Sequence, residues 1–208
     1  MSNIGAVHNS VGDPQEALKY YNQALPIMRS VGDRSGEATT LSNIGLAYHS
    51  TCKPQEALKY YNQALPIMRS VGDRNGQAVT LSNIGLVYNS IGDPQEALKY
   101  YNQALPIMRS VGDSSGKSAT LNNIGLAYHS IGQPQEALKY YNQALPIKRS
   151  VGDRSGEAAT LSNIGFAYRD TKQPTQALAN WQQSVQITLE MRSGLQRENR
   201  QKFLEANR

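Results

Sequence analysis

Residues 41–80 read LSNIGLAYHSTCKPQEALKYYNQALPIMRSVGDRNGQAVT, and this 40-residue stretch recurs with small changes along the chain. In both halves of the stretch, apolar and small residues recur at spacings of three and four, which is the spacing of one face of a helix. Turn residues separate the halves at Cys52-Lys53-Pro54, and a second break lies at Val71-Gly72-Asp73. The stretch therefore predicts a hairpin of two helices.

Capping residues stand at the ends of the expected helices. Asp13 and Asp93 each precede a proline, and a glutamate follows three residues after the aspartate, which is the pattern of a helix N-terminus. The second helices are followed by glycines, which tolerate the left-handed backbone that ends a helix: Gly32, Gly72, Gly112 and Gly152. The spacing of Arg29 and Asp33, which recurs in later copies, predicts an ion pair at this end of the helix.

The repeated positions resemble the tetratricopeptide repeat. The residues that carry the resemblance in one copy are Leu41, Ile44, Gly45, Tyr48, Ala57, Tyr61 and Ala64. The 40-residue period is similar to that of the longer repeats in kinesin light chains and many bacterial signalling proteins. The resemblance implies an all-α fold, a right-handed superhelical solenoid of stacked hairpins, because a single hairpin cannot bury both of its apolar faces.

The repeats also predict how the chain is organised. We expect five repeats over residues 1–188, with boundaries 1–33, 34–73, 74–113, 114–153 and 154–188, and a charged helical extension over 189–208. The first repeat lacks the residues that correspond to 33–40, so we interpret the chain as a fragment. The segment from Leu189 resembles the segment that precedes caspase-like CHAT peptidase domains. Pro26 and its equivalents inside the second helices predict kinks, whereas Gln186 in the fifth copy lets that helix run straight on.

Composition excludes several classes of protein. Hydrophobic residues make up 39% and charged residues 18%, which is too apolar for a disordered chain. The net charge of +5 is spread without a basic stripe, so we expect no nucleic-acid partner. No apolar stretch is long enough to span a membrane, and no signal peptide stands at the start. A single cysteine, Cys52, fits a reducing cytoplasm.

Residues that could carry chemistry are few. His49 and Cys52 lie three residues apart, yet Cys52 stands where other copies have glycine, so a helix-end position is the better interpretation than a nucleophile pair. The glycine turns lack the Lys-Ser/Thr of a phosphate loop. The sequence therefore predicts no catalytic residue, no metal site and no cofactor.

Variation between copies points to one face. Units 41–80 and 81–120 differ at ten positions, and none of these lies between Pro54 and Asp73. Gene conversion or packing could cause this segregation, and so could variation for binding on the first helix. The resemblance places the first helices on the concave side of the array. The candidate binding residues there are Asn43, Leu46, His49, Asn83, Leu86, Asn89, Asn123, Leu126, His129, Asn163, Phe166 and Arg169.

These residues predict a non-catalytic protein-interaction scaffold. Asparagine amides both donate and accept hydrogen bonds, so a ladder of them can hold the backbone of an extended peptide, while the leucines contact its side chains. A partner's helix is the other expected ligand for the groove. Two alternatives stay open: each asparagine bonds its own helix-pair neighbour, or the chain is a structural module that forms homo-oligomers through its incomplete first repeat.

Overall fold

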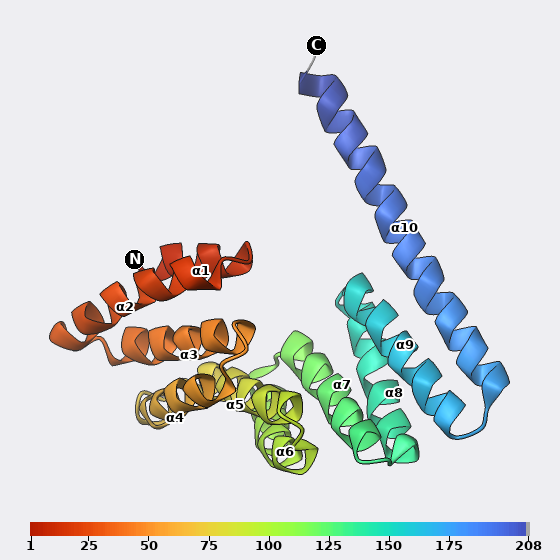
Figure 1. Ribbon diagram of the computed structural model, residues 1–208, viewed down its shortest axis with the longest axis horizontal. Coiled ribbons are helices and arrows are strands. Elements are labelled where there is room, and N and C mark those ends of the chain that lie inside the picture. The colour runs from red at the N-terminus through yellow and green to blue at the C-terminus, as the bar shows by residue number, and fades with distance from the viewer. Residues whose placement is uncertain (207–208) are drawn as a thin grey trace. The chain divides into compact units, whose positions relative to one another are not determined.

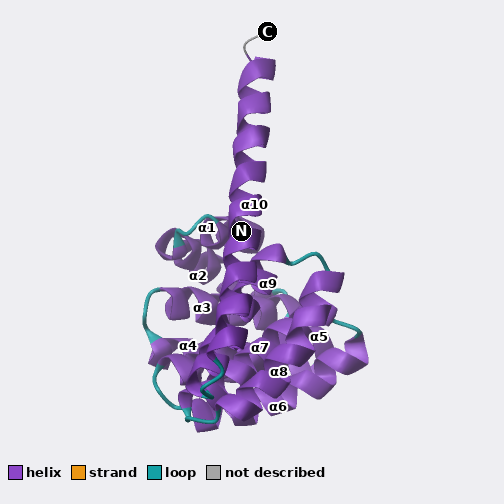
Figure 2. Ribbon diagram, turned by 90° about the vertical axis from the view of Figure 1, so that its right-hand side faces the viewer, coloured by secondary structure: helices purple, strands orange, loops and turns teal. Residues whose placement is uncertain are grey.

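The computed structural model describes the backbone of residues 1–206 and the side chains of residues 1–194. Over this range the chain forms ten helices joined by short turns, and it contains no strand (Figure 1 and Figure 2). The predicted all-α fold is confirmed. The helices are α1 (Ser2–Ser10), α2 (Pro14–Ser30), α3 (Arg34–Ser50), α4 (Pro54–Ser70), α5 (Arg74–Ser90), α6 (Pro94–Val111), α7 (Ser114–Ser130), α8 (Pro134–Ser150), α9 (Arg154–Asp170) and α10 (Pro174–Ala206).

The chain divides into two compact units, Met1–Asp113 and Ser114–Arg208. The first unit contains the hairpins α1/α2, α3/α4 and α5/α6, and the second contains α7/α8 and α9/α10. Within a unit, the second helix of one hairpin packs on the first helix of the next, as α4 does on α5 and α8 on α9. Each unit is thus a stack of hairpins that share a core.

The core of the first unit shows how one hairpin covers the next. Leu58, Tyr61 and Leu65 of α4 are buried in one cluster with residues of α5. The α5 residues in this cluster are Ala78, Leu81, Ile84 and Val87. On the same hairpin, the rings of Tyr48 and Tyr60 stack with their centroids 5.4 Å apart. The helix-face assignment made from residue spacing is therefore correct for α4 and α5.

The predicted caps hold the second helices. The carboxylate of Asp13 accepts a hydrogen bond from the amide of Glu16 at 3.1 Å, and Asp93 accepts one from Glu96 at 3.0 Å. Gly72 has a φ of +73°, as predicted for a residue that ends a helix. Cys52 has a φ of +56° and an exposed thiol, which supports its interpretation as a substitute for glycine at a helix end.

The predicted ion pair between Arg29 and Asp33 is wrong. Asp33 caps α3 instead, because its carboxylate accepts a hydrogen bond from the amide of Gly36 at 2.8 Å. The guanidinium of Arg29 reaches one turn further and donates to Glu37 at 2.9 Å. Glu37, and not Asp33, is therefore the partner of Arg29.

The second helices differ at the position of the internal proline. The helices α2, α4, α6 and α8 stay helical through Pro26, Pro66, Pro106 and Pro146, respectively. With Gln186 at this position, α10 continues as one helix to Ala206. Its C-terminal part extends beyond α9 in space (Figure 1). The predicted extension 189–208 is therefore helical as far as Ala206. Residues 207–208 lie outside the described residues, and the likeness to a pre-CHAT segment stays a prediction.

Candidate functional site

The outward residues of α3 and α5 form one face of the first unit, which we call the α3/α5 stripe. Its predicted binding residues are all half-buried: Asn43, Leu46, His49, Asn83, Leu86 and Asn89. The two helices contact each other directly, so the six residues lie on adjacent helices. A pocket of about 280 Å³ opens along this face. Its lining residues are Thr39, Ser42, Asn43, Met68, Asp73, Asn75, Gly76, Val79 and Thr80.

The polar groups of the α3/α5 stripe are of two kinds. The hydroxyls of Ser42 and Thr80 are buried and form a hydrogen bond with each other at 3.0 Å, which joins α3 to α5. The side-chain amides of Asn43 and Asn83, in contrast, make no hydrogen bond with any residue that the structure describes. The asparagine ladder of this unit is therefore not used to hold neighbouring helices together.

Further along the stripe, His49 and Asn89 lie close to the helix ends. The Nε2 atom of His49 lies 3.4 Å from the hydroxyl of Ser90, and burial lowers the pKa of His49. The side-chain oxygen of Asn89 is buried and has no hydrogen-bond partner in the described part of the chain. At this end of the α3/α5 stripe, a ligand could therefore donate a hydrogen bond to the side-chain oxygen of Asn89.

The second unit carries the corresponding α7/α9 stripe. Asn123, Leu126, His129 and Asn163 are half-buried, whereas Phe166 and Arg169 are exposed. Here the two asparagines differ. Asn163 donates to the side-chain oxygen of Asn122 at 3.3 Å, so it bonds α7, the first helix of the preceding hairpin. The amide of Asn123 has no hydrogen bond within the described residues.

Charged groups gather at one end of the α7/α9 stripe. The carboxylate of Asp170 lies 2.8 Å from His129 Nε2 and accepts a hydrogen bond from Arg169 at 2.8 Å. The hydrogen bonds from Arg169 and His129 hold the pKa of Asp170 below its ordinary value. The guanidinium of Arg169 also lies over the ring of Phe166, 5.2 Å from its centroid. The two stripes therefore differ in charge, although their asparagines and large apolar residues correspond.

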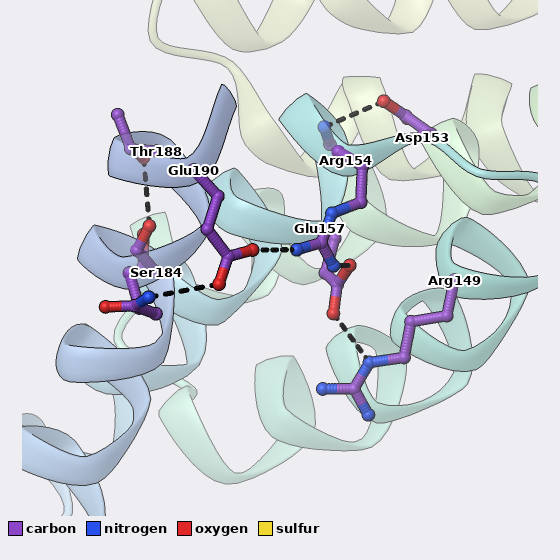
Figure 3. Close-up of polar contacts among 9 residues, drawn as sticks. Arg149, Asp153, Arg154, Glu157, Ser184, Thr188 and Glu190 are labelled. Carbon is purple, nitrogen blue, oxygen red and sulfur yellow. Dashed lines mark hydrogen bonds and ion pairs between the residues drawn. The ribbon is translucent and has the colours of Figure 1, made fainter. Parts of the chain in front are cut away.

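Sequence reasoning missed two buried carboxylates, Glu37 and Glu157. The side chain of Glu157 accepts hydrogen bonds from Arg149 of α8 at 2.8 Å and from Arg154 of α9 at 2.7 Å. Arg154 in turn donates to Glu190 of α10 at 2.7 Å, so a single network ties three helices together (Figure 3). The recurring spacing of two arginines and one glutamate, at 29, 34 and 37 and again at 149, 154 and 157, was the signal in the sequence.

A pocket of about 530 Å³ lies beside this network. Its lining residues are Arg154, Glu157, Ala179, Gln182, Gln183, Gln186, Ile187 and Glu190. Burial raises the pKa of Glu157, but the hydrogen bonds from Arg149 and Arg154 outweigh this effect and hold the pKa below its ordinary value. At neutral pH the carboxylate of Glu157 is therefore ionised. Its hydrogen bonds with arginines of α8 and α9 link these two helices.

The described residues hold neither a metal-binding cluster nor a membrane-spanning helix. No group of three or more histidine, cysteine, aspartate or glutamate side chains is placed to hold a metal ion in the part of the chain with described side chains. None of the described helices is both long enough and apolar enough to cross a membrane.

Stacked helical hairpins with an outward stripe on the first helices define a helical-repeat protein. Models of the tetratricopeptide repeat match residues 1–70, 72–150 and 158–191. The chain belongs to the tetratricopeptide repeat family, as its resemblance predicted, and this family consists of protein-interaction scaffolds. A search of curated proteins gave no match.

Solved structures share this fold. BtubC (BKLC) from P. vanneervenii is 20% identical with a TM-score of 0.80, and the match covers 90% of this chain and 78% of that chain. A signal transduction ATPase with a tetratricopeptide repeat sensor from Pyrococcus horikoshii is 19% identical with a TM-score of 0.82, over 94% of this chain and 30% of that chain. A Rap protein complexed with Competence and Sporulation Factor is 17% identical with a TM-score of 0.80, over 91% and 53%.

Proposed function

We propose that this chain is a non-catalytic protein-interaction scaffold that binds an extended peptide along its first-helix stripes. The observation that carries the proposal is the pair of half-buried amides of Asn43 and Asn83, which have no hydrogen-bond partner among the described residues. Polar groups in such positions gain a hydrogen bond when a ligand displaces water from the face. Leu46 and Leu86, also half-buried, stand one turn further along the same helices and offer apolar contacts.

An extended peptide fits these amides better than a partner's helix does. The backbone groups of a helix are already paired with one another, so they leave little for an asparagine to bind. An extended chain offers free N–H and C=O groups, and three of its residues span about 10 Å. Neighbouring packed helices lie about 8–10 Å apart. Asn43 and Asn83 can therefore bond main-chain groups about three residues apart.

The comparisons support a scaffold of this kind. The chain belongs to a family of protein-interaction repeats, and a Rap protein with the same fold is complexed with Competence and Sporulation Factor. The α3/α5 stripe is the part of this chain where such a ligand would lie.

A randomised peptide library displayed on phage tests the proposal. Peptides enriched on the wild-type chain are measured against the double variant Asn43→Ala/Asn83→Ala. A matched control is Asn62→Ala/Asn102→Ala, because these asparagines have the same repeat spacing but are exposed on α4 and α6. We expect the first variant to weaken binding by about 1–3 kcal/mol in total and the control to leave it unchanged. Peptides that bind the first variant as tightly as the wild type would contradict the proposal.

A further inference from the structure

At two places in the array, a pair of arginines binds one buried glutamate. At the first place, Arg29 Nε donates to one carboxylate oxygen of Glu37 at 2.9 Å, and Arg34 Nη1 donates to the other oxygen. At the second place, one arginine of α8 and one of α9 bind the two oxygens of Glu157 in the same way (Figure 3). In each pair, one arginine lies at the end of a second helix and the other at the start of the next first helix. We call these two places the Glu37 copy and the Glu157 copy.

A third arginine pair, Arg69 of α4 and Arg74 of α5, has a glutamine where the other copies have the glutamate. This residue is Gln77, and it is buried like Glu37 and Glu157. A glutamine side chain has the length of a glutamate but carries no charge. The guanidinium groups of Arg69 and Arg74 are exposed, and neither forms a hydrogen bond or an ion pair with any side chain that the structure describes.

The backbone around Arg69 and Arg74 corresponds to the backbone of the other two copies. Asp73 caps α5 through a hydrogen bond of 2.8 Å, and Asp33 and Asp153 cap α3 and α9 at the same distance. The helices α4 and α5 each have 17 residues, as α8 and α9 do. The two guanidinium groups can therefore converge on one carboxylate, as the arginines of the Glu37 and Glu157 copies do.

The next helix, α6, does not supply the missing charge. In the Glu157 copy, Arg154 also donates to Glu190 of α10 at 2.7 Å. The residue of α6 that corresponds to Glu190 is Ser110, whose hydroxyl donates to the carbonyl of Ile107 at 2.7 Å. Among the described side chains, the third pair thus has neither of the two carboxylates that bind the arginines of the Glu157 copy.

We propose that Arg69 and Arg74 bind the carboxylate of an aspartate or glutamate side chain of a partner protein, with the amide of Gln77 as a further donor. In the other two copies each arginine binds a different oxygen of the same carboxylate, so the pair matches a planar group with two oxygens. The side-chain nitrogen of Gln77 has two hydrogens to donate. None of these three residues lines the pocket of the α3/α5 stripe, so this is a second binding site.

NMR of the arginine side chains of the full chain tests the proposal. The probe is N-acetylglutamate α-amide, whose only charge is its side-chain carboxylate, and N-acetylglutamine α-amide is the neutral control. At constant ionic strength, we expect the glutamate probe to shift the Nε–H resonances of Arg69 and Arg74 along a saturable curve. The Nε–H resonance of Arg149 should not move, because this group already donates to Glu157.

The variant Gln77→Glu supplies the carboxylate from the chain itself, as in the other two copies. We expect it to raise the thermal midpoint and to weaken binding of the glutamate probe by about tenfold or more. The matched control is Gln55→Glu, which adds the same charge at an exposed residue of α4. This position is about 21 Å from Arg69 along the helix axis, so binding of the probe should not change.

Three results would overturn the proposal. The first is an equal shift of Arg69 and Arg74 by the glutamate and glutamine probes, since the carboxylate would then not be recognised. The second is a thermal midpoint of Gln77→Glu below that of the wild type, which would show that the guanidinium groups do not reach position 77. The third is a response to N-acetylphosphoserine α-amide with none to the glutamate probe, which would make the ligand a phosphate group.

Discussion

The ring of Tyr61 lies directly against Gly45, where a methyl group on Gly45 would meet Tyr61 Cε1 at 2.7 Å. Tyr61 is fully buried, and burial raises the pKa of its hydroxyl. The same close approach recurs at Gly5/Tyr21, Gly85/Tyr101 and Gly125/Tyr141. In the last hairpin Trp181 takes the place of the tyrosine, and its indole N–H donates to the carbonyl of Ser162 at 3.2 Å. The two helices of a hairpin approach closely because this glycine has no side chain.

Replacing Gly45 with alanine should therefore destabilise the first unit. Overpacking of a buried site costs about 1–3 kcal/mol, because the ring of Tyr61 has no free space to move into. The gain from alanine in a helix, about 0.5–1 kcal/mol, offsets only part of this cost. Gly194→Ala is the matched control, since an added methyl group at Gly194 meets nothing within 4 Å. Urea denaturation should give a lower midpoint for Gly45→Ala and an equal or higher one for Gly194→Ala.

Glu157→Gln should lower stability at neutral pH and lose its effect in acid. The folded pKa of Glu157 is lower than the ordinary value of 4.5, so its contribution is fully present above about 4.5. That contribution is lost as the pH falls through the lowered folded pKa, because the protonated acid no longer attracts the arginines. We expect a loss of about 1 kcal/mol at pH 7, since Arg149 and Arg154 are half-exposed to solvent.

Denaturation of wild type and Glu157→Gln at neutral and acidic pH checks this sign. The difference between the two midpoints should shrink as the pH is lowered. Glutamine already occurs at this repeat position, because Gln77 of α5 corresponds to Glu157 and is buried. A difference that grows in acid would mean that Glu157 is not stabilised as a carboxylate.

The fold could be predicted from the sequence because each copy repeats the same local signals. Helical spacing placed Leu58, Tyr61 and Leu65 on one face, and these residues are buried together. The capping aspartates Asp13 and Asp93 marked helix starts through short-range hydrogen bonds. Such signals depend on residues a few positions apart, so they can be read without knowing how the hairpins pack.

Contacts between side chains from different helices were harder to predict. Glu37 and Glu157 are buried and accept hydrogen bonds from an arginine of the preceding helix, and the choice between aspartate and glutamate as the arginine's partner depends on how far each side chain reaches in three dimensions. For the same reason, the spacing of the asparagines did not predict which of them bond another helix. Asn163 bonds Asn122 across two helices, whereas Asn43 has no such partner in the described chain, although both stand at one repeat position. The site residues themselves stay a prediction.

Ala57→Leu should destabilise the chain much more than Ala159→Leu does. Ala57 is fully buried in the cluster that joins α4 to α5, so a larger side chain must displace its neighbours. The expected cost is about 1–3 kcal/mol. Ala159 is exposed on α9, where leucine adds only surface. Thermal melts followed by circular dichroism compare the two, and equal midpoints would show that the helix faces are assigned wrongly.

The last prediction concerns the effect of salt on a peptide bound at the α3/α5 stripe. Asn43, Leu46, Asn83 and Leu86 carry no charge, so their contacts with a neutral peptide involve hydrogen bonds and apolar burial. Screening by added salt acts on interactions between charges, with a range of about 10 Å at 0.1 M. The dissociation constant of a neutral peptide selected on this face should therefore change little between low and high salt in a fluorescence titration.

Asp73 lines the pocket of about 280 Å³ on the α3/α5 stripe, and it gives this titration an internal control. Its carboxylate already accepts a hydrogen bond from the amide of Gly76 at 2.8 Å, but it still presents a negative charge to the pocket edge. A peptide with one added lysine should bind more tightly at low salt and lose this gain as salt rises, whereas the neutral peptide should not. If binding of the neutral peptide falls steeply with salt, charged residues elsewhere on the chain hold it, and the asparagines of the α3/α5 stripe do not.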